Sequence, residues 1–483
     1  MPPFTRTFEI ESPMLRLAVH GLGVALLTVI VGYILSGKEL PLLLAGLAGL
    51  FCLILFRNPH WGVLAIFLFW FIRYSPTLLG SRFLQLSHII ALVLFVPLAL
   101  RMLRDREIWV WRVPQVKYLL GIGVLFLVSS MWADYKYPIT FMPELDRTFE
   151  MTQDYITHTL FLVFFLYFVN TRKKLDAFVW LAIVLIVLSV ADAYSRLLLM
   201  PGVRRVNASF GLGKSPTVFP YVCLFGASLL WCYYSFAQTK RWKGWAGPVL
   251  ASIPVIALAT GSRTALLQLM AFATLVFMDR SGGWSSSKRL RGLFLLVCVG
   301  LLMTLVVPTI AVMRSTSFES TATSPGAQSL KDRVKTVQAG AALVASDPVL
   351  GVGLGNFLWL HTAGWGLRRF PHNSYLWALA EGGIGVLVLY LMLFYATYRM
   401  LRQIENHGPP DYLWLAKAFK FNLILLMIYS MTDDAWLHDL TFLLIAASIA
   451  LYRLWATEVM RAAPAVPDDR RPLTTLQPAG MRR

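Results

Sequence analysis

Charged residues are scarce in this chain of 483 residues, at 14%, whereas hydrophobic residues make up 57%. A soluble globular protein of this size needs more polar side chains than that to cover its surface. The mean hydropathy of +0.63 and the repeated apolar runs near spanning length therefore predict an all-α polytopic membrane protein with about 12–14 transmembrane helices. No shift in composition separates the runs, so we expect a single membrane body.

Cysteine is also rare, and its spacing fits neither a disulfide framework nor a metal site. All four cysteines fall inside apolar runs and are expected to be small buried hydrophobic residues: Cys52, Cys223, Cys232 and Cys298. The start of the chain lacks a small-residue cleavage site before its first apolar run. We interpret that run as a retained first span and not as a removed signal peptide.

Acidic residues are the other scarcity, with 25 Asp and Glu against 44 Lys and Arg and a net charge of +19. The basic residues form short clusters between apolar runs and no contiguous basic face, so we expect no binding of nucleic acid. If the spans alternate, most of these clusters lie on one side, which the positive-inside rule assigns to the cytoplasm. The sequence thus predicts a multi-pass protein of a bacterial inner membrane with both termini cytoplasmic.

Four segments follow from this topology. The segment from Ser329 to Glu381 carries Arg, Lys, Asp and His between two hydrophobic spans, which is where aqueous chemistry can take place. We expect it to face the periplasm. The predicted segments are a transmembrane body (1–313), a periplasmic catalytic loop (314–373), C-terminal transmembrane helices (374–460) and a disordered cytoplasmic tail (461–483).

Several basic residues lie on the predicted outer side, against the rule: Arg205 and Lys214, in the stretch PGVRRVNASFGLGKSP, and Arg263, in ATGSRTA. Such residues are candidates for binding an anion, although pairing with a local carboxylate or with lipid phosphate is the alternative. Arg263 has no acidic residue near it in sequence, so its guanidinium could hold a phosphate through two hydrogen bonds.

An amphipathic helix is predicted to begin at Ser329, with Asp332 in a capping arrangement. Its apolar face comprises Leu330, Val334, Val337, Ala341 and Val344, with Lys331 and Lys335 on the solvated side. Arg333 falls at the border of the apolar face. A helix along the bilayer edge would direct Arg333 inward, toward a headgroup or substrate; a solvated charge is the alternative.

The helix should end at Asp347-Pro348, where GVGLGNF begins. Gly351, Gly353 and Gly355 are expected to permit a tight backbone path that could present N–H groups to a ligand. This is no dinucleotide fingerprint, because the spacing is wrong. Farther on, Asn373 and Ser374 can cap the helix that re-enters the membrane. The N-terminus of that helix disfavours a proton on His372, so we expect this imidazole to be neutral and able to act as a base.

These motifs resemble the shared domain of O-antigen ligases and O-antigen polymerases over about residues 204–398. The residues that carry the resemblance are Gly261-Ser262-Arg263, Arg333, Asp347-Pro348, Gly351 to Phe357, His372 to Leu376, and Glu381-Gly382-Gly383. The resemblance implies an inverting membrane glycosyltransferase of the C type that acts in polysaccharide or lipopolysaccharide biosynthesis. Its donor would be a glycan linked to undecaprenyl diphosphate.

The resemblance also implies roles for individual residues. His372 would be the general base, and Arg263 and Arg333 would bind the diphosphate, with no metal or other cofactor required. We add Arg205 and Lys214 to the expected diphosphate site, and Asn373 and Glu381 to the supporting residues of the loop. The acceptor stays open among a lipid A core, a second lipid-linked glycan and a protein hydroxyl, as in protein O-oligosaccharyltransferases. A flippase or exporter of lipid-linked glycan is the alternative from another functional class.

Overall fold

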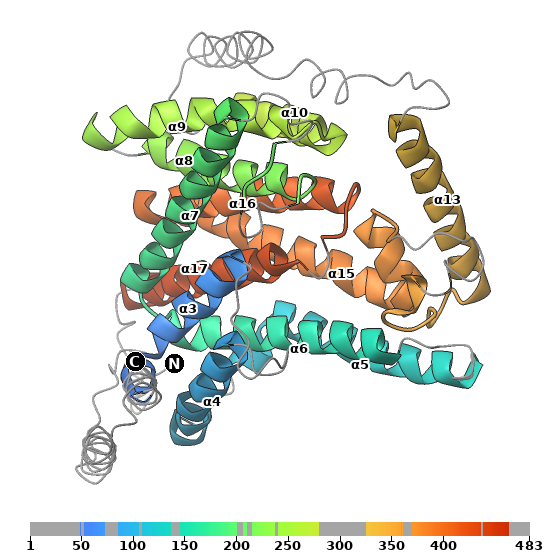
Figure 1. Ribbon diagram of the computed structural model, residues 1–483. Coiled ribbons are helices and arrows are strands. Elements are labelled where there is room, and N and C mark those ends of the chain that lie inside the picture. The colour runs from blue at the N-terminus through green and yellow to red at the C-terminus, as the bar shows by residue number, and fades with distance from the viewer. Residues whose placement is uncertain are drawn as a thin grey trace, which may run out of the picture.

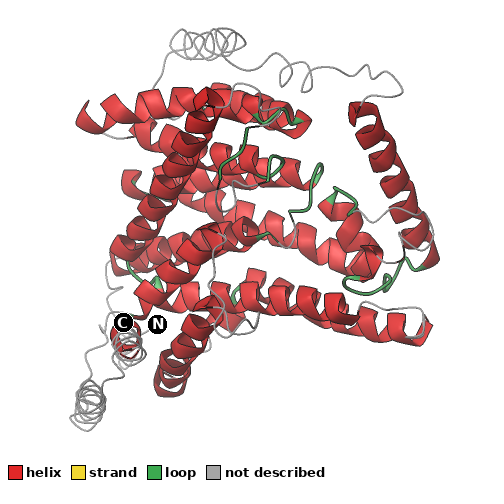
Figure 2. Cartoon of the chain, viewed as in Figure 1, coloured by secondary structure: helices red, strands yellow, loops and turns green. Residues whose placement is uncertain are grey.

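The computed structural model of the chain describes residues 53–72, 86–105, 109–136, 145–199, 206–209, 215–236, 240–279, 325–358, 370–435 and 438–462, with isolated positions 49 and 360. Regular secondary structure within these ranges is helical throughout (Figures 1 and 2). The α-helices are α3 (Pro59–Ile72), α4 (Leu86–Asp105), α5 (Pro114–Lys136), α6 (Leu145–Phe168), α7 (Arg172–Leu199), α8 (Phe219–Phe236), α9 (Lys240–Ala259), α10 (Arg263–Met278), α13 (Pro325–Ser346), α15 (Ser374–His407), α16 (Pro410–Ser430) and α17 (Asp439–Ala462).

The chain is a polytopic membrane protein, as predicted. Within the described residues, six helices are long and apolar enough to cross a membrane, namely α5, α7, α8, α15, α16 and most of α17. Shorter apolar helices occur in α3, α4, α9 and α10. The predicted total of 12–14 spans includes apolar runs before residue 49 and in 281–324, which lie outside the described residues, so that total stays a prediction.

The centre of the bundle is formed by α8, α15 and α16. α16 packs against both α8 and α15, while α15 packs along α5 and α6 packs along α17. The rings of Tyr221 on α8 and Tyr429 on α16 stack at 5.0 Å with an interplanar angle of 3°. Both residues are buried. Helices that are apolar on all sides can bury themselves in this way, because they have no polar face that must reach water.

A buried ion pair fixes the direction of α10 relative to α16. Lys417, near the start of α16, places its Nζ 2.5 Å from the Oδ1 of Asp279, which directly follows α10. Both side chains are almost fully buried. Since the end of α10 meets the beginning of α16, the two helices run antiparallel. Arg263, the first residue of α10, therefore lies toward the end of the bundle at which α16 finishes.

A kink in α15 is built jointly with the glycine-rich segment that precedes it. Gly383 has φ 70° and ψ −173° inside α15, a backbone conformation that L side chains rarely adopt. The kink frees backbone carbonyls that would otherwise accept helical hydrogen bonds. Val352 N–H donates to the carbonyl of Ala380, and Gly353 N–H donates to that of Glu381, both at 2.9 Å. The 351–357 segment thus satisfies the interrupted helix.

Helix α13 lies across the ends of the bundle, transverse to α5 and α15 (Figure 1). It begins at Pro325, earlier than the predicted Ser329, and it ends before Asp347-Pro348 as predicted. The predicted apolar face is not the face that is buried against the bundle. Three residues of the predicted face are exposed, namely Val334, Val337 and Ala341. The buried residues of α13 lie on another face and are Asp332, Thr336, Ala339 and Gly340.

The small residues of α13 are buried because they let this helix approach α15 closely. A Cβ at Gly340 would meet Leu376 of α15 at 2.7 Å, so the small residue lets the two helices touch. Thr336 donates its hydroxyl hydrogen bond to the carbonyl of Asp332, which satisfies it within the helix. The small and polar face is therefore buried against protein, whereas Val334 and Val337 are exposed and Val344 is only partly buried.

Candidate active site

His372 lies in the turn just before α15, and its backbone has φ 48°. Positive φ is uncommon outside glycine, and the surrounding structure must hold it. Asn373 caps α15 as predicted, because its side chain accepts hydrogen bonds from the N–H groups of Tyr375 and Leu376, each at 3.0 Å. Ser374 donates its hydroxyl to the Asp433 carbonyl at 2.8 Å. The turn before α15 is thereby tied to the turn after α16.

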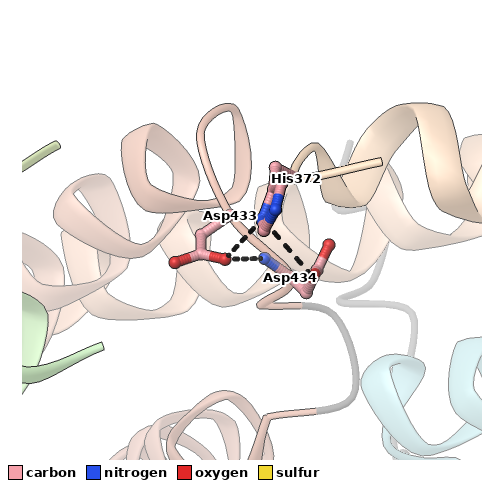
Figure 3. Close-up of side chains that lie close together, drawn as sticks. All are labelled: His372, Asp433 and Asp434. Atoms are coloured by element: carbon pink, nitrogen blue, oxygen red, sulfur yellow. Dashed lines mark hydrogen bonds and ion pairs between the residues drawn. The ribbon is translucent and has the colours of Figure 1, made fainter. Parts of the chain in front are cut away.

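Two carboxylates from that second turn face the imidazole (Figure 3). The Nδ1 of His372 lies 3.3 Å from the Oδ1 of Asp433 and 3.8 Å from the Oδ2 of Asp434. The Asp433 side chain is only 7% exposed, whereas that of His372 is 30% exposed. The backbone N–H of Asp434 also donates to Asp433 Oδ1, at 3.0 Å. We call His372, Asp433 and Asp434 the acid–histidine cluster.

The three groups shift one another's titration. The hydrogen bond to Asp433, opposed by burial but supported by the charge of Asp434, raises the pKa of His372 above its ordinary value. Burial alone would raise the pKa of Asp433, but hydrogen bonds from His372 and Thr217 lower it overall. Burial, followed by repulsion from Asp433, raises the pKa of Asp434 to about 7. Near neutral pH, Asp433 is therefore ionised while Asp434 exchanges a proton.

This finding corrects the expected charge state of His372. The sequence suggested that the helix N-terminus would lower its pKa, but the carboxylates outweigh that effect and the pKa is raised. A carboxylate at hydrogen-bond distance stabilises the imidazolium more strongly than a helix end destabilises it. The Nε2 atom of the imidazole remains available for chemistry, because Asp433 is hydrogen-bonded to Nδ1 only.

Arg333 on α13 is the cation that the structure brings to this cluster. Its charge acts on both His372 and Asp434 and partly offsets the rise in the pKa of each. The side chain is partly exposed, whereas Lys331 and Lys335 on the same helix are exposed, as predicted. Arg333 is thus near enough to the candidate base to act on it, although Val334, Val337 and Ala341 of the predicted apolar face are exposed.

Arg263 is partly buried at the start of α10, preceded by Gly261 with φ 61° and by the buried Ser262. The antiparallel arrangement of α10 and α16 puts it toward the end of the bundle that carries Asp433. The other two predicted anion-binding residues, Arg205 and Lys214, lie outside the described residues. Val206, next to Arg205 in sequence, donates its N–H to the carbonyl of Ala259 at 3.1 Å, four residues before Arg263.

The predicted supporting residues gather around the kink of α15. Glu381 is fully buried, its Oε1 accepts the N–H of Phe357 at 3.1 Å, and its carbonyl also accepts the Ser129 hydroxyl at 2.6 Å. The glycines all have positive φ: Gly351 73°, Gly353 87° and Gly355 85°.

The idea that these glycine amides face a ligand is wrong at two positions. The N–H of Gly351 donates to Asp347 O, and that of Gly353 donates to Glu381 O and to Ser129 Oγ. The glycines instead allow two backbone segments to pack closely together. A Cβ at Gly351 would lie 2.5 Å from the carbonyl carbon of Glu381, so only glycine fits this close approach.

Sequence reasoning missed the roles of Asp433 and Asp434. They stand 61 and 62 residues after His372, in a connection between two apolar spans on the predicted outer side. Adjacent carboxylates at such a position are a usable signal, because ionisable groups at membrane edges are costly and are usually functional. Nothing in the sequence pattern, however, indicates which polar residue of another connection they contact.

The acid–histidine cluster also has the composition of a cation site. Each of its three residues offers one ligand atom, and these atoms lie within 4.8 Å of one another. One oxygen of each carboxylate, Asp433 Oδ2 and Asp434 Oδ1, is buried without a hydrogen-bond partner in the described structure. One imidazole nitrogen and two carboxylates are ligands that Mn²⁺, Fe²⁺ or Zn²⁺ accept.

In comparisons with known proteins, a family model matches the part of the chain that contains His372, Arg333 and Arg263. No curated protein matches the chain. Residues 248–391 match the family model Wzy_C, described as O-antigen ligase. The match runs from within α9 to within α15, so it includes the kink of α15 and the 351–357 segment but not Asp433. The protein is therefore a polytopic membrane protein whose residues 248–391 are similar to the Wzy_C O-antigen ligase domain.

Proposed function

We propose that the protein is a glycosyltransferase that moves a glycan from undecaprenyl diphosphate to an acceptor hydroxyl at the periplasmic face of the inner membrane. The observation that supports this most directly is the hydrogen bond between His372 and the buried Asp433, with Arg333 close enough to act on the same imidazole. A candidate base and a cation that acts on it lie at one end of a membrane bundle, within residues 248–391.

The base is His372 acting through Nε2. Asp433 accepts a hydrogen bond from Nδ1–H, which places the proton on Nδ1 and leaves the lone pair on Nε2. The acceptor hydroxyl gives its proton to Nε2 as its oxygen attacks the anomeric carbon. The imidazolium that forms is stabilised by the ionised Asp433, because the pKa of this carboxyl is lowered.

The leaving group is the lipid diphosphate. As the bond from the anomeric carbon to the diphosphate oxygen breaks, the electron pair leaves with the diphosphate, and negative charge increases there. Arg333 and Arg263 are the proposed partners for that charge, with Arg205 and Lys214 as further candidates. A single in-line displacement of this kind inverts the anomeric configuration, and it needs no metal ion.

The topology is part of the proposal: both termini cytoplasmic, α13 and the acid–histidine cluster periplasmic. The exposed Ala341 on α13 offers a test. In an otherwise cysteine-free background, Ala341→Cys should react with an impermeant maleimide in intact spheroplasts. Labelling that requires opening of the inner membrane would place the candidate active site in the cytoplasm.

Transfer itself is tested with purified protein, an undecaprenyl-diphosphate glycan and candidate acceptors. His372→Gln keeps hydrogen bonding but has no usable basicity, so turnover should fall about 10²- to 10⁴-fold. The matched control is His407→Gln, because His407 ends α15 far from the cluster in sequence and should tolerate the change. Normal turnover by His372→Gln would remove the proposed base.

The exporter alternative predicts a different result. A flippase would change the leaflet of the lipid-linked glycan without breaking its bond to the diphosphate, so no acceptor would receive glycan in the purified system.

The acceptor is identified by comparing glycolipids and glycoproteins from a deletion strain with those of the parent strain. An unligated polymer indicates a ligase that uses lipid A core, accumulation of single repeats indicates a polymerase, and an unmodified protein indicates a protein O-oligosaccharyltransferase.

A further inference from the structure

An apolar groove of about 540 Å³ runs between α5 and α6, away from the acid–histidine cluster. α5 is engaged with α15 on its other side, and α6 with α17, α3 and α4. The two consecutive helices are consequently not closely packed along their length. Tyr155 crosses the gap, donating its hydroxyl hydrogen bond to the carbonyl of Leu119, and its ring forms part of the floor.

The lining of the groove is one face of each helix, without a charged side chain: Leu119, Leu120, Gly123, Val124, Phe126, Leu127 and Ser130 on α5, and Thr148, Phe149, Thr152, Tyr155, Ile156, Thr159, Leu160 and Val163 on α6, with Trp111 and Leu354. The floor is buried, as at Phe126 and Tyr155, whereas rim residues such as Val124 and Ile156 are more than half exposed. From Leu119 to Ser130 the helix rises about 16 Å. This is a long, narrow and uncharged slot.

The outer end of the groove is connected to the candidate active site through the 351–357 segment. Ser130, Thr148 and Thr152 gather there, and Leu354 of the 351–357 segment closes it. Leu354 N–H donates to the Ser130 hydroxyl at 3.3 Å, and a Cβ at Gly355 would approach the Thr148 Cα to 3.1 Å. The same segment is hydrogen-bonded to Glu381 of α15. Between Glu381 and Ser374, next to His372, α15 rises about 10 Å.

We propose that this groove holds the part of the lipid-linked donor's polyprenyl tail that lies next to the diphosphate. The inference rests on the proposed function. An uncharged slot of this shape fits a linear hydrocarbon chain, and its volume is within the roughly 300–1,000 Å³ of ordinary ligand sites. Its hydroxyl-lined end lies toward the catalytic turn, so the diphosphate of a lipid in the groove is directed toward Arg333 and His372. The groove thereby selects a donor by its tail.

The first test uses donors that differ only in tail length. The same glycan is presented on undecaprenyl diphosphate and on dimethylallyl diphosphate, whose single isoprene unit is too short to reach Val124 from the hydroxyl-lined end, and the apparent KM of each donor is measured. The wild-type protein should prefer the long tail. Val124→Trp, which fills the groove from its exposed rim, should raise the apparent KM of the undecaprenyl donor about tenfold, a loss of about 1.4 kcal/mol, and leave that of the dimethylallyl donor unchanged.

The matched control is Leu188→Trp on α7, where the side chain is 52% exposed and lies outside the groove. It should leave both donors unchanged. Equal effects of Val124→Trp and Leu188→Trp would overturn the inference. An effect of Val124→Trp on the apparent KM of the acceptor in place of the donor would do so too, because the groove would then hold an acceptor lipid.

The second test does not depend on turnover. A diazirine analogue of undecaprenyl diphosphate, without glycan, should cross-link to peptides from α5 and α6, and undecaprenyl diphosphate should compete. Equal competition by phosphatidylglycerol would mean that the groove takes bulk lipid, against the inference. Cross-linking that is specific while no acceptor receives glycan would leave the groove intact and refute the glycosyltransferase proposal instead.

Discussion

Replacing Asp433 by Asn tests the proposed mechanism most sharply. The Asn side chain has the same shape as the buried Asp433, and its amide oxygen can still accept hydrogen bonds from His372 Nδ1 and the Asp434 N–H. In the wild-type protein these two donors lie 3.3 and 3.0 Å from Asp433 Oδ1. What is lost is the negative charge that stabilises the imidazolium. A hydrogen bond to a charged group is worth about 1.5–3 kcal/mol, which corresponds to a fall of about 10- to 150-fold in turnover.

The pH profile separates this effect from a structural one. The base form of His372 is the deprotonated imidazole, so a raised pKa shifts the acid limb of the wild-type kcat/KM profile to higher pH than free histidine would give. Asp433 is the first cause of that raised pKa. Asp433→Asn should therefore lower the plateau and, at the same time, move the acid limb to lower pH, which mere loss of folded protein cannot do.

Asp434→Asn is the matched control. Since the pKa of Asp434 is about 7, the amide mimics the form that this residue already holds below neutral pH. Turnover at pH 6 should stay within a few-fold of wild type, with a difference appearing only above pH 7. Transfer is measured with undecaprenyl-diphosphate glycan, on protein whose insertion is checked by gel filtration in detergent. Full turnover by Asp433→Asn, with an unmoved acid limb, would refute the His–Asp pair as the base.

Three further predictions concern the anion site, the absence of a metal and the kink of α15. Arg333→Ala should lower turnover about 10- to 100-fold, Arg333→Lys should restore part of it, and Lys335→Ala, a change at an exposed position of the same helix, should stay near wild type. Dialysis against EDTA should leave turnover unchanged; a loss reversed by one divalent cation would instead assign that cation to the acid–histidine cluster. Gly383→Ala should lower the free energy of unfolding by about 1–3 kcal/mol or more, because its Cβ would lie 2.0 Å from Val349 O, whereas Gly247→Ala, with open space around its Cβ, should not destabilise the protein. Thermal unfolding in detergent compares the two, and equal midpoints would contradict the role assigned to the kink.

The membrane class, the end of α13 and the start of α15 were determined by the sequence alone. A chain with so few charged residues cannot cover itself with polar surface in water, whatever its topology. Asp347-Pro348 ends α13, and Asn373 caps α15, because a helix terminus depends on neighbouring residues in the chain.

The composition of the acid–histidine cluster was decided only by tertiary structure. Periodicity gives the direction of a side chain relative to its own helix, but not its partner on another one. Hence His372 was predicted as a base while the partner, Asp433, was not, and the carboxylates reversed the expected shift in its pKa. In a membrane protein, moreover, an apolar face can meet either protein or lipid. Helix α13 illustrates this ambiguity, because its small and polar face packs against α15 whereas Val334 and Val337 are exposed.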